Sequence, residues 1–491
     1  MDEQRSLAVS TVKGTIWNYV TFGASKLVTF ISTAILARLL SIDDFGIMAL
    51  GLIAIGYLDT LNGMGVEQVV IYKQKNIEKI SDAAFTLSLV VNALLTAIAF
   101  LFAPAIALFF KEPRLVNIVR ALSLTFIIGA LGAVHEARLK KDLRFRRTVL
   151  PEVSKTIVKA VVSIGMALLG YGVWSLVWGQ IASVLTANIL YVWVFRWRPK
   201  LVFDLTIMRE IIGYSSQIVL TDIMGMIQNN IDYVIIGRRM DSERLGYYTI
   251  AFRVPELLIV NMCVIVGTAL FPAYSKLQNS LETLRKGFLA TLRFVSLYTV
   301  PIGVGLSIVS PQFIEVAFGE RWLPAAPLMQ ALSLYAMFYS LSFNAGDIYK
   351  AIGRPDILNK LSVIQLLIVI PALWFSAGYG VFYVALAQVI LSALLAVVKL
   401  LVIRRLIGLH FVDILSAIRP GATGAIVMVA AVLGLQVFVR ELSPLLQLLI
   451  LSLSGGLIYV ATIWLTNREV VWQGVNVLRD ILVKRPRLND L

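Results

Sequence analysis

Polar side chains recur at helical spacing within a segment that is otherwise mostly apolar. Ser215, Asp222, Gly225, Asn229 and Asp232 are separated by 7, 3, 4 and 3 positions, so they lie on one face of an α-helix. Carboxylates and amides on such a face hydrogen-bond to sugars or hold a cation. In lipid, a polar face is costly unless it meets protein or water. The spacing therefore predicts a helix that lines a polar cavity.

A second charge is predicted near the middle of the membrane. Lys26 lies roughly 18 Å, and Asp222 roughly 16 Å, from the inner ends of their helices. Both depths are near the centre of a ~30 Å hydrocarbon core. For Lys26, three interpretations stay open: contact with a phosphate, a structural salt bridge with Asp222, or a side chain that snorkels to the head groups.

Charged residues nearer the membrane surfaces are further candidates for the cavity lining and for a gate. Lys159 is predicted about 12 Å into its helix, where it is a candidate for the cavity. Asp232 and Arg253 come at similar depth near the outer ends of neighbouring helices, and a pair between them would close or brace an outer gate. The alternatives are a static cap or loop contact for Asp232, and a pair between Arg253 and Glu256 at i and i+3.

Two acidic residues are candidates for ion coupling. Asp59 and Asp222 each place a carboxylate deep in a predicted helix, where it would bind a coupling H+ or Na+. We expect no other cofactor, and no metal site, because the chain has only two histidines and one cysteine. No nucleophile elbow or phosphate loop is present, so we predict no catalytic residues and no enzymatic activity.

These residues belong to a chain whose composition is typical of a polytopic membrane protein. It has 491 residues, of which 58% are hydrophobic and 15% charged, and its mean hydropathy is +0.83. The N-terminus lacks a small-residue cleavage site, so we expect no removable signal peptide. Fourteen apolar spans are predicted, at 14–37, 46–70, 83–110, 115–135, 151–170, 172–195, 211–237, 246–271, 287–310, 326–349, 358–377, 379–403, 419–439 and 443–466.

The charge distribution predicts the orientation. If both termini are cytoplasmic, the inside loops carry most of the 44 Lys and Arg residues, as the positive-inside rule requires. The net charge of +15 is then a topology signal and does not indicate nucleic-acid binding. The richest inside loop, at 138–147, serves orientation alone or also attracts anionic lipid head groups or a polyanionic substrate.

A weak internal repeat predicts two lobes. ARLLSIDDFGIMAL at 37–50 aligns with GRRMDSERLGYYTI at 237–250, so that Gly46 matches Gly246. An even number of spans per repeat implies a pseudo-two-fold axis along the membrane normal. We therefore predict an all-α integral membrane fold with an N-lobe at 1–200, a C-lobe at 201–410, and two further helices and a cytoplasmic tail at 411–491.

The sequence resembles a known family in its first loop (ARLLSIDDFGIMAL), at the end of its second helix (LNGMGVEQVVIYKQ) and in NNIDYVIIGRRMDSERLGYYTIAFRVPELL. These stretches are similar to the polysaccharide transporter, or Wzx-like, branch of the multidrug/oligosaccharidyl-lipid/polysaccharide exporter superfamily, closest to members that serve colanic and teichuronic acid. Glu67 departs from the family, which places a small or uncharged residue there.

The resemblance implies a flippase of the bacterial inner membrane. Such a protein moves undecaprenyl-pyrophosphate-linked oligosaccharide repeat units from the cytoplasmic to the outer leaflet by alternating access, for exopolysaccharide, O-antigen or capsule synthesis. The expected partners are membrane lipids, a polysaccharide polymerase and a chain-length regulator. The protein is expected to be a monomer. The alternatives are a drug/cation antiporter of the same superfamily, and an integral-membrane glycan polymerase or ligase, although the chain lacks the large outside loop usual in such enzymes.

Overall fold

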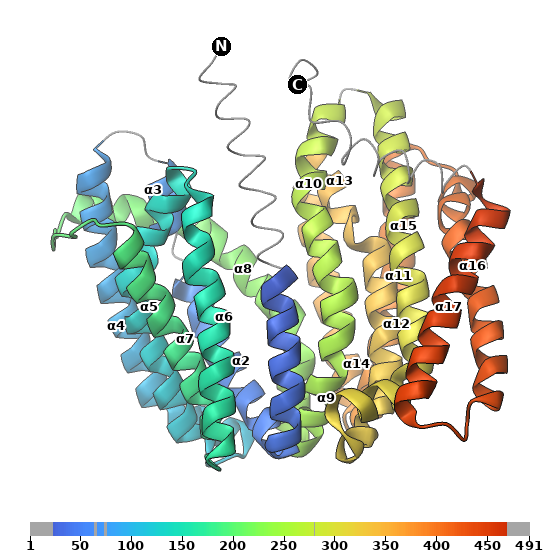
Figure 1. The fold of residues 1–491 in the computed structure, drawn as a ribbon. Coiled ribbons are helices and arrows are strands. Elements are labelled where there is room, and N and C mark those ends of the chain that lie inside the picture. Colours follow the sequence, from blue (N-terminus) through green and yellow to red (C-terminus); the bar gives the residue numbers. More distant parts are fainter. Residues whose placement is uncertain (1–22, 63–65, 73–75, 279, 469–491) are drawn as a thin grey trace. The chain divides into compact units, whose positions relative to one another are not determined.

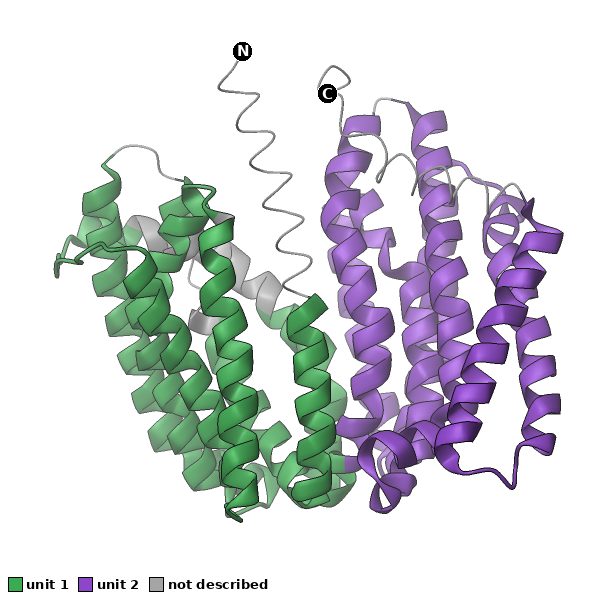
Figure 2. Ribbon diagram, viewed as in Figure 1, with its two compact units in different colours: residues 1–246 green, residues 247–491 purple. Residues whose placement is uncertain are grey.

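The computed structural model describes residues 23–62, 66–72, 76–278 and 280–468 of the chain, without the side chains at 61, 62, 66–68, 145 and 210–222. The described residues form helices joined by short connections, and none of them is in a β-strand (Figure 1). The all-helical prediction is thus confirmed for this part of the chain. Contacts divide the chain into two compact units, unit 1 at 1–246 and unit 2 at 247–491 (Figure 2).

In unit 1, the first described segment is helical over residues 23–39. Its further helices are α2 (Ile42–Asn62), α3 (Val66–Tyr72), α4 (Ile77–Phe110), α5 (Leu115–Lys141), α6 (Phe145–Leu168), α7 (Val173–Val194) and α8 (Leu205–Arg239), followed by the start of α9 (Ser242–Pro255). Neighbours in sequence pack in pairs, α4 with α5 and α6 with α7, while α8 packs on α2 and α4.

Unit 2 continues α9 and contains the remaining helices and helical turns. They are the π-helical turn η1 (Glu256–Val260), α10 (Asn261–Leu277), α11 (Leu281–Phe318), the 3-10 turn η2 (Glu320–Ala325), α12 (Ala326–Phe343), α13 (Ala345–Ala351), α14 (Pro355–Ser376), α15 (Val381–Ile407), α16 (Phe411–Phe438) and α17 (Pro444–Thr466). Helix α11 packs on both α12 and α16, and α15 packs on α12.

Nine helices of the described chain are long and apolar enough to cross a membrane. Each of the fourteen predicted spans overlaps a helix or a series of helices, although the number of membrane crossings stays a prediction. Helices α6 and α8 are not among the nine. Both carry several charged or amide side chains, which lower their mean hydropathy, and both contain residues predicted to line the cavity.

Two predicted spans are interrupted. The span at 246–271 includes the π-helical turn η1, which starts directly after Pro255. Proline cannot donate the backbone hydrogen bond of a regular helix, and π-turns occur where that ladder is disturbed. The span at 326–349 breaks at Asn344, between α12 and α13. The periodicity of apolar residues continues through both interruptions, so it does not reveal them.

Helix α8 is held close to its neighbours in unit 1 by glycines. A β-carbon at Gly56 of α2 would lie 2.6 Å from the methyl carbon of Met226 in α8. At the other end of the contact, Gly237 of α8 faces Leu50 of α2 and lies against the ring of Phe110 of α4. The absent side chains let the helix axes approach, as in other closely packed membrane helices.

The predicted lobes and the observed units are defined differently. The prediction assigns α8 to the C-lobe, because the repeat begins again near residue 201, whereas the contacts of α8 with α2 and α4 place it in unit 1. The duplication boundary at residue 200 stays a prediction, as do the two further helices and tail at 411–491. Residues 1–22 and the predicted cytoplasmic tail at 469–491 lie outside the described residues.

Candidate functional site

The two repeat-related segments of unit 1 meet in a reciprocal backbone contact. A β-carbon at Gly46 of α2 would overlap the carbonyl oxygen of Ser242, and one at Gly246 of α9 would overlap the carbonyl oxygen of Ile42. Positions 42 and 242, like 46 and 246, are matched by the repeat. The first turns of α2 and α9 therefore face each other with the symmetry that the repeat predicts. Only glycine permits this approach at either position.

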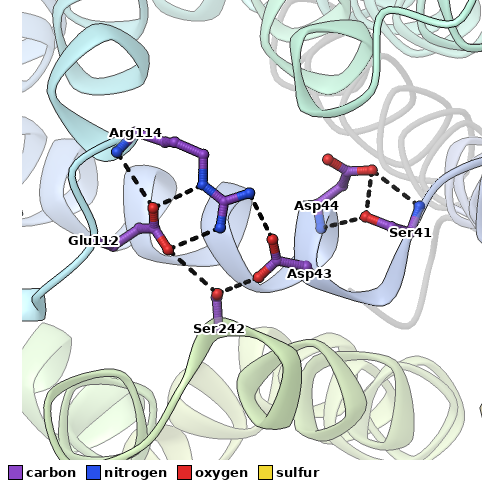
Figure 3. A network of polar contacts seen from close by, with 6 residues as sticks. All are labelled: Ser41, Asp43, Asp44, Glu112, Arg114 and Ser242. Atoms are coloured by element: carbon purple, nitrogen blue, oxygen red, sulfur yellow. Dashed lines mark hydrogen bonds and ion pairs between the residues drawn. The ribbon is translucent and has the colours of Figure 1, made fainter.

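A network of charged side chains surrounds this contact (Figure 3). The guanidinium of Arg114 donates from Nε and Nη2 to the two carboxylate oxygens of Glu112, at 2.8 and 2.9 Å. Its Nη1 lies 2.7 Å from Oδ2 of Asp43, at the start of α2. The hydroxyl of Ser242 donates to Oδ1 of Asp43. The network thus joins the α4–α5 connection to the first turns of α2 and α9.

Charge-assisted hydrogen bonds stabilise the charged form of Arg114. The hydrogen bond to Glu112, followed by that to Asp43, raises the pKa of Arg114 further above its usual value. A bidentate guanidinium–carboxylate pair also fixes the relative orientation of the two side chains. Nearby, Asp44 accepts hydrogen bonds from the backbone N–H and the hydroxyl of Ser41, at 2.9 and 2.7 Å. Ser41 directly precedes α2, so these bonds stabilise the start of the helix.

On α8, the predicted polar residues differ in exposure. Asp232 is 6% exposed, and its Oδ1 accepts a hydrogen bond from the N–H of Tyr233 at 2.9 Å. Its carboxylate also interacts electrostatically with the phenol of Tyr57 in α2. Asn229 is exposed, so the two residues have different surroundings although they are only three positions apart. Helix α8 thus buries one edge of the polar face against α2.

The other predicted residues of α8 lie in the part whose side chains are not described. Asp222 and Ser215 are within the helix, but their side chains lie outside the described set, as does that of Glu67 in α3. The predicted salt bridge between Lys26 and Asp222 therefore stays a prediction. Lys26 itself is half-buried in the helix described over residues 23–39.

Lys159 has a defined polar partner in unit 1. Its Nζ donates to Oε1 of Gln180 in α7 at 2.6 Å. One face of α6 carries a second such contact to α7, because the hydroxyl of Tyr191 donates to Oε1 of Glu152 at 2.8 Å. These contacts place polar groups between two helices. Asp59, the candidate for ion coupling, is exposed on α2.

Arg253 makes the contact predicted as its alternative. Its Nη1 lies 3.5 Å from Oε2 of Glu256, and both side chains are about a third exposed, at 38% and 35%. The spacing of i and i+3 at the junction of α9 and the π-turn brings the two side chains together. The proposed gate pair of Asp232 with Arg253 stays a prediction.

Lys399 is a charged residue that the sequence analysis gave no role. It lies in α15, eight residues before the helix ends at Ile407, or roughly 12 Å along the axis. It follows Gln388, Ser392 and Ala396 along one buried stripe of the helix. Among the described residues, its ammonium group has no ion-pair partner. It lies within the predicted span at 379–403, but the sequence alone does not show which side chains surround it.

Two basic residues in the last turn of α5, Arg138 and Lys141, make contacts with neighbouring segments. Arg138 donates from Nη1 to the hydroxyl of Ser81 at 3.1 Å, and its guanidinium lies 5.3 Å from the ring centre of Phe195. Lys141 donates to the carbonyl oxygen of Val70 at 2.9 Å, at the end of α3. These side chains therefore serve packing in addition to any effect on orientation.

Comparison with known proteins decides the family. The family model described as "Polysaccharide biosynthesis protein" matches residues 35–327, which is more than half of the chain. The chain belongs to this polysaccharide biosynthesis family. The match includes both glycines of the reciprocal contact and the whole network around Arg114. The family resemblance predicted from the sequence is thereby confirmed.

Curated relatives match much of the chain at low identity. The teichuronic acid biosynthesis protein TuaB of Bacillus subtilis is 24% identical over 359 residues, covering 72% of this chain and 73% of its own. The lipopolysaccharide biosynthesis protein WzxC of Escherichia coli is 24% identical over 370 residues, covering 75% of each chain. The succinoglycan biosynthesis transport protein ExoT of Rhizobium meliloti is 23% identical and covers 96% of this chain and 95% of its own.

Solved structures share the fold of this family member. The lipid II flippase MurJ, in an inward closed conformation, superimposes with a TM-score of 0.73 over 93% of this chain and 99% of its own, at 17% identity. An inward-facing multidrug transporter of the MATE family gives a TM-score of 0.64 over 78% of this chain and 94% of its own, also at 17% identity. The chain is thus a multi-pass membrane protein with the fold of these transporters.

The reciprocal glycine contact is tested by adding one methyl group. We expect Gly46→Ala and Gly246→Ala each to lower the thermal unfolding midpoint of the detergent-purified protein, because the new β-carbon must displace a backbone carbonyl, an overpacking that costs about 1–3 kcal/mol. Gly129→Ala, within α5 where a β-carbon meets open space, is the matched control and should leave the midpoint unchanged or raise it. Equal midpoints for all three variants would contradict the contact.

Proposed function

We propose that this protein is a flippase that moves undecaprenyl-pyrophosphate-linked oligosaccharide repeat units from the cytoplasmic to the outer leaflet. The observation that carries the proposal is the set of charged and amide side chains within predicted spans in a member of a polysaccharide biosynthesis family. Its support includes the names of TuaB, WzxC and ExoT, which tie those relatives to polysaccharide synthesis, and the fold shared with the lipid II flippase.

The physical demands of such a substrate match the chemistry of the candidate residues. Its prenyl chain is stable in lipid, whereas its diphosphate and glycan must be sheltered from hydrocarbon. In our proposal, ammonium groups at Lys26, Lys159 and Lys399 attract the diphosphate during transit, and Asn229 hydrogen-bonds to sugar hydroxyls. Lysine acts as a point charge toward phosphate, so it holds a moving anion without demanding one geometry.

In the proposed mechanism, the protein alternates between an outward-open and an inward-open cavity. The contact between the first turns of α2 and α9 is a tight closure at the end predicted to face outside, and it must separate when the cavity opens there. The network of Asp43, Glu112, Arg114 and Ser242 would hold this closure and release it. Asp59 or Asp222 would bind a coupling H+ or Na+, and Asp232 with Arg253 would brace the same end.

The setting we propose follows from the substrate. A lipid-linked repeat unit is assembled at the cytoplasmic face, so the flippase would work in the bacterial inner membrane with both termini in the cytoplasm. A polymerase and a chain-length regulator would act on the product at the outer face. The protein would function as a monomer, because each chain contains both repeats.

Deletion of the gene in its host tests the proposal. We expect lipid-linked repeat units to accumulate on the cytoplasmic leaflet, where external periodate does not oxidise them, while one surface polysaccharide disappears. Plasmid-borne wild-type protein should restore both. Loss of drug resistance with the surface polysaccharide intact would contradict the flippase and favour an antiporter.

Lys399 gives a residue-level prediction within the same assay. In the deletion strain, Lys399→Met should reduce polysaccharide output at least tenfold at an unchanged protein level, because it removes a cation from the path of the diphosphate. Lys399→Arg keeps the charge and should retain most of the output. The matched control is Lys360→Met, at an exposed residue of α14. Wild-type output from Lys399→Met would remove this residue from the proposed site.

A further inference from the structure

An apolar groove runs along the surface of unit 1. It has a volume of about 550 Å³ and lies among α2, α4 and α8. Its walls include Ile53 and Tyr57 of α2, Phe102, Ala105 and Phe109 of α4, and Val234 of α8. The volume falls within the range of about 300–1,000 Å³ that is usual for small-molecule sites.

The lining of the groove selects for hydrocarbon. Ordinary ligand pockets combine apolar walls with a few polar groups that orient the ligand. Here every lining residue is apolar except Tyr57, with its single hydroxyl. Phe102 and Phe109 are 58% and 47% exposed, so the groove is open along a helix that is predicted to cross the membrane. A polar solute would find no partners along these walls, whereas a lipid chain needs none.

A cation stands at one end of the groove. The guanidinium of Arg238, in the last turn of α8, lies 5.4 Å from the ring centre of Phe109. Among the described residues, it has no carboxylate partner. Near this end of α4 and α2, Glu112 and Asp43 are engaged by Arg114. Asp44 accepts hydrogen bonds from the N–H and hydroxyl of Ser41. An uncompensated charge beside an apolar groove is complementary to an anionic head group with an attached chain.

We propose that this groove binds one hydrocarbon chain of an anionic bilayer phospholipid, whose phosphate is held by Arg238. The apolar walls of the groove favour a lipid chain, and a single guanidinium suits a single phosphate. The bound chain packs against α2, α4 and α8 together, and so it stabilises the packing of α8 against the other two helices. The proposal does not depend on the transported substrate.

Native mass spectrometry of the detergent-purified full-length protein tests the site. With added phosphatidylglycerol, we expect one lipid to be retained at a collision energy that strips phosphatidylcholine, and the thermal unfolding midpoint to rise. Ala105→Trp fills the groove and should weaken this binding about tenfold. Leu101→Trp is the matched control, because Leu101 lies one turn away, is 73% exposed and does not line the groove.

A second variant tests the contact between Arg238 and the lipid phosphate. Arg238→Gln should bind phosphatidylglycerol and phosphatidylcholine alike, because the chain keeps its groove while the phosphate loses its partner. Arg440→Gln removes an equal charge from an exposed position and should keep the preference. The proposal is overturned if Ala105→Trp retains phosphatidylglycerol as the wild type does, if Arg238→Gln keeps the preference, or if a polyprenyl phosphate displaces phosphatidylglycerol at equal concentration.

Discussion

The structure depends on how closely two short backbone segments approach each other. The first turns of α2 and α9 meet where Gly46 faces the carbonyl of Ser242 and Gly246 faces that of Ile42. Interiors of proteins are packed too tightly to accommodate an extra methyl group between two backbones without displacement. This contact fixes the start of α2, and the network around Arg114 forms at its edge.

Several polar side chains within the predicted spans have hydrogen-bond partners. A buried ionisable group is costly in lipid, and this cost falls when a partner or water satisfies it. Lys159 has Gln180, Glu152 has Tyr191, and Asp232 has a backbone N–H. Neutral partners of this kind satisfy hydrogen bonds without cancelling the charge.

The sequence predicted the helices well, because apolar periodicity and polar connections are local properties. It also predicted that positions 46 and 246 correspond. Correspondence in a repeat does not show contact, however, and the meeting of the two glycines depends on packing between segments 200 positions apart. The spacing on α8 gave a polar face but not its neighbour, so it did not predict that Asp232 is buried against α2 while Asn229 is exposed. Lys399 lies within the predicted span at 379–403, but its surroundings depend on packing between helices, which the sequence does not show.

The central claim is that the contact between residues 42–46 and 242–246 must open during transport. The side chains of Asp43 and Ser242 are in direct hydrogen-bond contact, so cysteines at both positions would be close enough for a disulfide. The only native cysteine, Cys263, is removed as Cys263→Ala. We predict that oxidation of Asp43→Cys/Ser242→Cys abolishes the movement of lipid-linked repeat units, that reduction restores it, and that either single cysteine is insensitive. Undiminished transport by the fully cross-linked protein would contradict the claim.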